Sequence, residues 1–494
     1  MMDVGSFGLA VSGFSGVGLA AILLNRVSER IQIPAPAFFL VGSAIAVRLV
    51  PDLGRLDQET VQRVVSIALV VILFDGGVHL GWRRFRRVAA PVALLGVVGT
   101  FLTAAGVAVF AHIALGFDWY VAVLLGAAIA PTDPAVVFAV LGNRVVGGPS
   151  GTVLAGESGA NDPVGIALMS ALVTAGGLSG AALMHGAGNF TVQMVVGLAG
   201  GLLGGRALLW FIRAVPLPDE GLYALRGLAG VFLIFGLTSA AGGSGFLAVF
   251  VAGIMLGDAR VPYKRETERF VQALAGLGEI VAFLVLGATV DLDVLARQDV
   301  WVPGLVLAVC LAVLIRPVLV GLCMVPLRIG RRDQGFVLWA GLKGAVPILL
   351  GSMLLGADVP DAPRLYGVVV VVVMVSVVLQ GSTVGLAAAL LRIPMHTVAP
   401  MPYSLGVRLR KPPDGAHRVT VAAGSIADGI RVRELPRDGE RQWVSLVVRD
   451  GRLMQVRRRT RLAAGDQVLV LVEQEQSAES LAVFTEPAPW RDES

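Results

Sequence analysis

The chain has 494 residues, of which 55% are hydrophobic and 15% are charged, and its formal net charge at pH 7 is +5. Soluble domains contain about 25% charged residues, so this composition excludes an ordinary soluble protein and predicts a polytopic membrane protein. The basic residues lie mainly in short loops and in the C-terminal region. They therefore indicate membrane topology rather than a nucleic-acid partner.

Apolar runs long enough to approach the roughly 20 residues of a membrane-spanning helix recur along most of the chain. Thirteen spans are predicted, at residues 5–24, 33–50, 61–80, 88–114, 119–141, 150–176, 188–212, 220–241, 245–258, 272–291, 300–326, 334–355 and 365–391. The ninth is short and flanked by glycines, so the count is accurate to about one span. We expect an all-α membrane domain over residues 1–391.

The distribution of Lys and Arg predicts the orientation. With the N-terminus outside, the inner loops hold most of the basic residues, including "RRFRR" (83–87) and Lys264. The predicted outer loops hold Arg48, Arg55, Arg63, Arg297 and Arg364. An odd number of spans then places the C-terminus in the cytoplasm.

The composition changes after residue 391. A proline-containing segment is followed by alternating runs such as "HRVTVAAG" (417–424) and "DQVLVLVEQ" (466–474). Runs of period two predict strands. We therefore expect a linker over 392–414, a small cytoplasmic α/β domain over 415–476 and an acidic tail over 477–494.

Four polar side chains stand in the sixth span, within "GESGANDPVG" (156–165). Ser158 and Asp162 are four residues apart and share one helical face, while Glu157 and Asn161 share a second face. Ionisable residues inside a span are costly and usually functional. Their density predicts a site rather than simple pairing between helices.

The fifth span is interrupted at "APTDPAVV" (130–137), where two prolines bracket Thr132 and Asp133. The missing amide hydrogens leave the carbonyls of Ala127 and Ala130 without helical partners. Such backbone is tolerated at membrane depth where it is buried in protein or lines a wet cavity. Carbonyl, hydroxyl and carboxylate oxygens suit an alkali cation, and without a His/Cys cluster a transition metal is disfavoured.

A second interruption is predicted in the twelfth span at "GLKGAVP" (341–347), where Pro347 frees the carbonyl of Lys343. If spans 1–6 and 8–13 are two copies of one unit, spans 5 and 12 occupy equivalent places. Crossed discontinuous helices in two inverted repeats indicate a transporter site near the middle of the membrane.

The charges inside the membrane need partners. We expect Arg316 to pair with Glu157. Lys343 is expected to neutralise either Asp133 or the partial charges where the two broken helices cross. Asp75 is either an acid of the cavity or a residue at a helix end.

This pairing leaves Asp162 without a cationic partner. Such a carboxylate binds either a proton or a cation near neutral pH, and that competition is sufficient for antiport. An ATP-driven pump would need a phosphate-binding loop, and none of the three lysines lies in a G-K-[ST] motif. A proton- or sodium-coupled solute symporter and a cation channel with a regulatory tail remain alternatives; neither an enzyme nor a resident cofactor is predicted.

In this order, "APTDPAVV", "GESGANDP" and "GLKGAVP" closely resemble the monovalent cation/proton antiporter-1 family, and in particular its potassium/proton branch. The resemblance covers about residues 5–391. It implies electroneutral exchange of K⁺ or Na⁺ for H⁺ across a prokaryotic cell membrane. It also implies a homodimer that works by alternating access, with an elevator-like movement of the core bundle.

The resemblance further implies roles for individual residues. Asp162 would be the carboxylate that binds cation and proton, with Ser158, Thr132 and Asp133 as further candidate ligands. Asn161 would be the neutral neighbour that goes with one-for-one exchange.

Glu157 and Arg316 would form a structural ion pair, and Asp75 would be an accessory acid. Lys343 stands where arginine is usual in the family, and the choice between K⁺ and Na⁺ stays open.

The C-terminal segments "VAAGSIADGIRVRELPRDGERQWVSLVVRDG" and "LAAGDQVLVLV" resemble the TrkA-C regulatory module of potassium-transport proteins. Such modules pair as dimers. The resemblance implies either a small regulatory ligand or a domain that stabilises a dimer without one.

Overall fold

The computed structural model describes residues 16, 19, 23, 34–50, 57–141, 144–327, 329–357, 359–397, 416–435, 442–450, 452–472 and 477–486. The chain divides into two compact units, Met1–Ala399 and Pro400–Ser494. The predicted span 5–24 and most of the predicted linker lie outside the described residues.

The first helices of the membrane unit follow the predicted spans. They are α2 (Ala35–Leu49), α3 (Gln58–Ala93), a π-helix η2 (Leu94–Gly99) and α4 (Thr100–Leu115). Within α3 the backbone turns sharply at Gly81, which has φ 62° and ψ 157°. Glycine adopts this conformation without steric cost, so it separates the two predicted spans 61–80 and 88–114.

Both predicted interruptions are present. The fifth span consists of α5 (Trp119–Ile129) and α6 (Pro134–Leu141), joined by four non-helical residues. The twelfth consists of α15 (Arg331–Trp339) and α16 (Ala345–Leu355), with a break at 340–344. Prolines account for the first break, since Pro131 and Pro134 cannot donate helical hydrogen bonds.

The remaining helices of this unit are largely apolar. They are α7 (Gly148–Ala175), α8 (Gly180–Ala214), α9 (Glu220–Ala240), α10 (Gly245–Gly257), α11 (Lys264–Ala288), α12 (Leu292–Leu295), α13 (Gln298–Cys310), η3 (Leu311–Val320), α14 (Gly321–Met324), α17 (Ala362–Val375), η4 (Ser376–Gln380) and α18 (Gly381–Leu390). Six helical segments among the described residues are long and apolar enough to cross a membrane.

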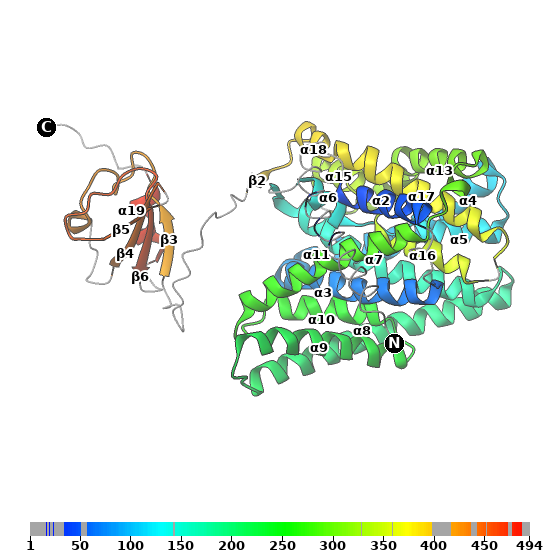
Figure 1. The fold of residues 1–494 in the computed structure, drawn as a ribbon, viewed down its shortest axis with the longest axis horizontal. Helices are drawn as coiled ribbons and strands as arrows, with labels where there is room; N and C mark the ends of the chain where they lie inside the picture. Colours follow the sequence, from blue (N-terminus) through cyan, green and yellow to red (C-terminus); the bar gives the residue numbers. More distant parts are fainter. Residues whose placement is uncertain are drawn as a thin grey trace. The chain divides into compact units, whose positions relative to one another are not determined.

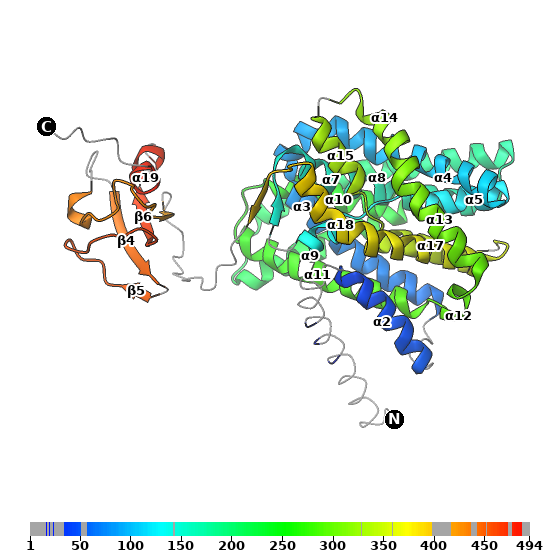
Figure 2. The same ribbon diagram turned by 90° about the horizontal axis from the view of Figure 1, so that it is seen from above.

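Two layers of helices meet at α3. On one side α3, α10, α8 and α9 lie next to one another (Figure 1) and share a hydrophobic core that includes Phe74, Val249 and Val231. On the other side a larger core surrounds the interrupted helices, with α13 lying along α17 (Figure 2). The polar residues of the sixth span lie on α7, and α7 contacts helices of both layers.

A short ladder ties the end of the membrane unit to its middle. Strand β2 (Met395–Thr397) pairs antiparallel with β1 (Arg144–Val146), the segment between α6 and α7. The amide of Gly147 also donates to the carbonyl of Pro394 over 2.7 Å. The first residues of the predicted linker are thus held against the membrane unit.

The C-terminal unit is a small four-stranded antiparallel sheet with one helix. The strands are β3 (Ala416–Thr420), β4 (Gln442–Arg449), β5 (Arg452–Met454) and β6 (Gln467–Val472), in the order β3-β6-β4-β5. The predicted alternating runs form β3, β4 and β6. Their inward side chains, such as Val447 and Val468, are fully buried.

Helix α19 (Ser477–Thr485) lies in the segment that the sequence analysis assigns to the tail. Its Phe484 is fully buried in the core of the C-terminal unit, and its carbonyl accepts the amide of Ala422 over 2.9 Å. An aromatic side chain of this size dominates a small core. The unit therefore extends to at least residue 485.

An ion pair between half-exposed Arg449 and buried Asp466 holds the ends of β4 and β6 together. Arg449 donates two hydrogen bonds to Asp466, at 2.7 and 2.8 Å, and the Ala463 amide donates a third at 2.9 Å. Burial opposes ionisation of Asp466, but these hydrogen bonds outweigh it and lower the pKa of the carboxyl. A carboxyl whose pKa is lower in the folded state stabilises the fold above its unfolded pKa, about 3.9. That contribution is lost as the pH falls toward the folded pKa.

We expect Asp466→Asn to lower the free energy of unfolding of residues 400–494 by about 1–2 kcal/mol at pH 7, because half-exposed Arg449 loses its charged acceptor. The difference from wild type should shrink as the pH is lowered below about 4. Urea unfolding at several pH values measures both effects. The control is Asp450→Asn, at an exposed turn with positive φ that asparagine adopts readily. A difference independent of pH would contradict the prediction.

Candidate functional site

The two interrupted segments meet inside the membrane unit. The amide of Asp133 donates to the carbonyl of Leu342 over 2.8 Å. Lys343 reaches back across the contact, and its Nζ donates to the carbonyl oxygens of Ala130 at 2.8 Å and Pro131 at 3.0 Å. Each interrupted segment thus provides hydrogen-bond partners for backbone groups of the other.

The position of Lys343 follows from the charges at helix ends. Carbonyls at the C-terminus of α5 carry partial negative charge, and the prolines deprive them of amide partners. The Lys343 ammonium, 2% exposed, supplies those donors. Of the two partners considered for Lys343 from the sequence, it contacts the helix end. The Ala130 carbonyl, expected to be free, is therefore occupied.

Asp133 accepts a hydrogen bond at the N-terminus of a helix, whereas Lys343 donates hydrogen bonds at a C-terminus. Its Oδ1 accepts the amide of Ala135 over 2.8 Å, in the first turn of α6. The carboxylate also lies against Gly344, where any Cβ would overlap it. A carboxylate is favourable at helix N-termini because the amides there lack partners.

The glycines of the second break permit close approach. A Cβ on Gly341 would overlap the guanidinium of Arg316, as one on Gly344 would overlap Asp133. Neither glycine has a positive φ. The sequence analysis did not anticipate this reason for their presence: they leave room for two charged side chains.

Thr132 is held by two polar residues of α7. Ser158 Oγ donates to the Thr132 carbonyl over 2.5 Å. Asn161 Nδ2 donates to Thr132 Oγ1 over 2.8 Å, and Asn161 Oδ1 accepts the Thr132 amide at 3.4 Å. All three residues are buried. Asn161 therefore orients the first break through both ends of its side-chain amide.

Asp162 lies on the same face of α7 as Ser158 and is 6% exposed. Its Oδ1 is buried and has no hydrogen-bond partner among the described residues. No ion pair joins it to a basic residue in the part of the chain that the structure describes. An unpartnered carboxylate in such a setting is costly, and so marks a place where a cation or proton is expected.

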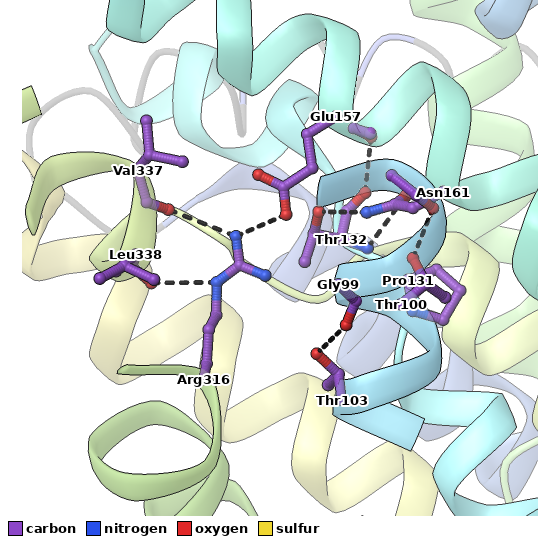
Figure 3. A network of polar contacts seen from close by, with 12 residues as sticks. Gly99, Thr100, Thr103, Pro131, Thr132, Glu157, Asn161, Arg316, Val337 and Leu338 are labelled. Atoms are coloured by element: carbon purple, nitrogen blue, oxygen red, sulfur yellow. Dashed lines mark hydrogen bonds and ion pairs between the residues drawn. The ribbon is translucent and has the colours of Figure 1, made fainter. Parts of the chain in front are cut away.

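Glu157 and Arg316 lie within hydrogen-bond distance. Arg316 Nη2 is 2.7 Å from Glu157 Oε1, and both side chains are almost fully buried. The guanidinium also donates to the carbonyls of Leu338 at 3.1 Å and Val337 at 3.3 Å, at the end of α15 (Figure 3). Arg316 therefore connects α7 to the second broken helix.

Asp75 lies on α3, away from these hydrogen bonds. Its Oδ1 is 3.2 Å from Nδ1 of His79, one turn further along the helix. Among the described residues, no hydrogen bond or ion pair joins Asp75 to Asp162 or Thr132.

The sequence analysis missed two polar residues, Ser376 and Gln380, at the ends of the π-helix η4. Ser376 Oγ accepts the amide of Lys343 over 3.1 Å and donates to Gln380 Oε1 over 3.0 Å. Gln380 Nε2 donates to the Trp339 carbonyl over 2.8 Å. Both are less than 8% exposed and bridge the second break. Their i, i+4 spacing in an apolar span was the available signal.

Comparisons with known proteins agree with this geometry. A family profile described as "sodium/hydrogen exchanger, transmembrane" matches residues 17–389. The chain belongs to this exchanger family. A second profile, that of the TrkA-C domain, matches residues 416–484 and identifies the C-terminal unit. Both resemblances noted in the sequence are confirmed.

Several exchanger relatives match over most of the chain. The K(+)/H(+) antiporter NhaP2 of Shewanella oneidensis is 32% identical over 482 residues, covering 96% of this chain and 82% of the relative. The K(+)/H(+) antiporter NhaP of Alkalimonas amylolytica is 34% identical over 386 residues, covering 76% and 65%. The Na(+)/H(+) antiporter ApNhaP of Aphanothece halophytica is 27% identical over 354 residues, covering 68% and 65%.

A solved exchanger structure supports the fold. The sodium proton antiporter MjNhaP1 from Methanocaldococcus jannaschii has a TM-score of 0.65 and 22% sequence identity, and the match covers 76% of this chain and 99% of that one. The helical membrane domain predicted from the sequence agrees with this likeness in being mostly helical.

We expect Glu157→Leu to destabilise the protein by about 3–5 kcal/mol, because it leaves the buried Arg316 guanidinium without its counter-charge. The double variant Glu157→Leu/Arg316→Leu should recover part of this loss. Recovery should be incomplete, since the carbonyls of Val337 and Leu338 then lose their donor.

Thermal unfolding of the detergent-purified protein measures the three variants. Arg63→Leu, which breaks an exposed ion pair with Glu59, is the control and should change little. A double variant less stable than either single variant would contradict a structural role for the pair.

Proposed function

We propose that this protein is a secondary active antiporter that exchanges a monovalent cation, K⁺ and/or Na⁺, for H⁺. The observation that carries the proposal is Asp162, a buried carboxylate beside the meeting point of two broken helices, whose Oδ1 has no hydrogen-bond partner among the described residues. Family membership supports the same class of activity. The surrounding charges Glu157 and Lys343 already have partners, which leaves Asp162 available.

The chemistry at Asp162 is a competition. A carboxylate accepts one proton or binds one cation, and it does not hold both. Ser158 Oγ and the Thr132 carbonyl lie at the same contact and offer further oxygen ligands for an alkali cation. Asp133 would supply negative charge nearby. Asp75 would be an accessory acid at the approach to the site, not a direct ligand.

Exchange would be electroneutral. One titratable carboxylate carries one positive charge in each direction, and Asn161 contributes no second charge. In this structure Asn161 serves to hold Thr132, so its role is to shape the break. The relatives named K(+)/H(+) antiporters support K⁺ as the exchanged cation of this chain, whereas the relative named Na(+)/H(+) antiporter ApNhaP supports Na⁺. The oxygen ligands described above can bind either cation.

The finer architecture belongs to the same proposal. It comprises about thirteen spans in two inverted repeats, with the helix pairs α5/α6 and α15/α16 in equivalent places. The N-terminus would lie outside and the C-terminus inside a prokaryotic cell membrane, and two copies would form the working dimer. The membrane domain would occupy residues 1–391, and the segment 392–414 would lead to the regulatory domain.

The TrkA-C domain would regulate exchange. The sequence assigns it to residues 415–476, and burial of Phe484 argues for including α19 as well. It would respond to a small ligand or stabilise the dimer. The proposal requires no cofactor and no enzymatic activity.

We expect Asp162→Asn to abolish cation-dependent proton movement, since asparagine neither releases a proton nor balances a cation. Proton flux in everted membrane vesicles, with K⁺, Na⁺ and Li⁺ compared, measures this. Asp118→Asn, at an exposed position before α5, is the control and should retain flux. Cation-dependent flux that survives Asp162→Asn would overturn the assignment, and flux driven by a neutral solute would favour a symporter.

We expect the exchange rate in proteoliposomes to stay the same when a membrane potential is imposed. Moving one net charge across 100 mV is worth about 2.3 kcal/mol, so an electrogenic cycle would respond strongly. Proton flux measured with and without a thiocyanate diffusion potential, at the same cation concentrations in both conditions, provides the test. A several-fold change in rate would contradict one-for-one exchange.

A further inference from the structure

Six arginines gather where two loop segments of the C-terminal unit pair with each other. The amide of Val432 donates to the carbonyl of Thr460 over 2.9 Å, and the amide of Arg433 donates to the carbonyl of Arg458 over 3.0 Å. The two segments thus lie side by side. Together they carry six arginines, here called the basic patch: Arg431, Arg433, Arg457, Arg458, Arg459 and Arg461.

Two residues of the patch lie directly opposite each other. Arg431 and Arg461 form an isolated antiparallel bridge. The hydrogen bonds are made by the residues on either side of them, so they are a non-hydrogen-bonded pair, in which the side chains lie close together on one face. Like charges at such positions destabilise the pairing. Folding of the unit therefore does not explain why both residues are arginine.

A tight turn presents two further arginines. The amide of Thr460 donates to the carbonyl of Arg457 over 2.9 Å, and Arg458 and Arg459 occupy the two positions between them. Both side chains are exposed. The central positions of turns favour Gly, Pro, Asn, Asp and Ser because of their backbone preferences. The geometry of the turn therefore does not explain the two arginines either.

The positive charge of the patch is balanced only in part. The Glu434 carboxylate lies 3.6 Å from Arg431 and 3.1 Å from Arg433, so these two arginines share one acid. The other four arginines of the patch have no ion pair with an acid among the described residues. Most of the charge is therefore available to a negatively charged partner.

The sequence of the C-terminal unit separates its charges. Residues 431–461 hold ten arginines and four acidic residues, whereas residues 462–486 hold five acidic residues and no basic one. A second copy of the chain does not suit the patch, because a symmetric contact through it would place like charges together. The partner that fits is an anion of another kind.

A bilayer surface suits this patch better than a small anion does. Several donors converge on a small bound anion, whereas these guanidinium groups are spread along two paired loops. The eighteen residues between Thr397 and Ala416 join the unit covalently to the membrane unit. Such a connection keeps its effective concentration at the bilayer high. Clusters of four to eight basic residues beside a membrane bind anionic lipids.

We propose that the basic patch docks the C-terminal unit onto the surface of a bilayer that contains anionic phospholipid. The guanidinium groups pair with lipid phosphates, which they can contact through two parallel hydrogen bonds. The attraction weakens as salt shortens the Debye length from about 10 Å at 0.1 M to about 3 Å at 1 M. Docking of this kind gives the regulatory unit a partner that exchange at Asp162 neither requires nor implies.

Fluorescence quenching by lipid tests the docking in the full chain. Cys310 and Cys323 are replaced by serine, and a fluorophore is attached to Ala464→Cys, which is exposed and three residues from Arg461. The protein is placed in nanodiscs of phosphatidylcholine, part of which carries a nitroxide on its headgroup. We expect quenching at least threefold stronger when about a third of the lipid is phosphatidylglycerol, and loss of this difference near 1 M salt.

Charge substitutions in the turn provide the matched comparison. The triple variant Arg457→Gln/Arg458→Gln/Arg459→Gln should lower the ratio of docked to free units at least tenfold, since each basic residue near an anionic surface contributes to binding. The triple variant Arg457→Lys/Arg458→Lys/Arg459→Lys keeps the charge and should retain most of the docking. Equal loss in both variants would overturn an electrostatic contact with the bilayer.

Two further outcomes would also overturn the proposal. One is equal quenching with and without phosphatidylglycerol at low salt. The other is release of the docked unit by micromolar pyrophosphate at constant ionic strength, which would make the patch a site for a free anion. No ion gradient is used, so failure to dock leaves the exchange proposed at Asp162 intact. Loss of exchange would likewise leave docking intact.

Discussion

The site depends on the hydrogen bonds that the Lys343 ammonium group donates to the end of α5. A membrane interior offers no water to unpaired backbone groups, so an interrupted helix survives where protein groups replace the lost hydrogen bonds. Lys343 supplies two of these bonds to the end of α5, and Asp133 accepts one at the start of α6. Ser376 and Gln380 do the same for the second break. The unusual backbone is thereby made stable enough to present Thr132 to α7.

Charge neutralisation elsewhere is what isolates Asp162. Glu157 is balanced by Arg316, and Lys343 by helix-end carbonyls. Asn161 is engaged with Thr132 through both its polar atoms. Asp162 remains in a buried position, and its Oδ1 has no hydrogen-bond partner among the described residues. The polar residues of the sixth span are therefore divided between those that build the scaffold and the one that is proposed to react.

Much of this arrangement could be predicted from the sequence, because proline and charge have strong local consequences. Pro131 and Pro134 predicted the first break, and the need of a buried cation for an acid led from Arg316 to Glu157. The sequence could not show which partner Lys343 has, because carboxylates and backbone carbonyls both attract an ammonium group. Only the interatomic distances in the structure distinguish the two possibilities. Ser376 and Gln380 were overlooked because neutral polar residues in an apolar run give a weak signal. Helix α19 was taken for a tail because its composition resembles one, and burial of Phe484 depends on the tertiary fold.

The pairing of β2 with β1 anchors the last described residues before the C-terminal unit to the membrane unit. The described residues of the membrane unit end at Thr397, in a strand that is hydrogen-bonded to the segment joining α6 to α7. Tension along the chain is thus applied first to the connection between the helix that follows Thr132 and the helix that carries Asp162. A displacement of β2 would therefore move α6 and α7 before it reached other parts of the membrane unit.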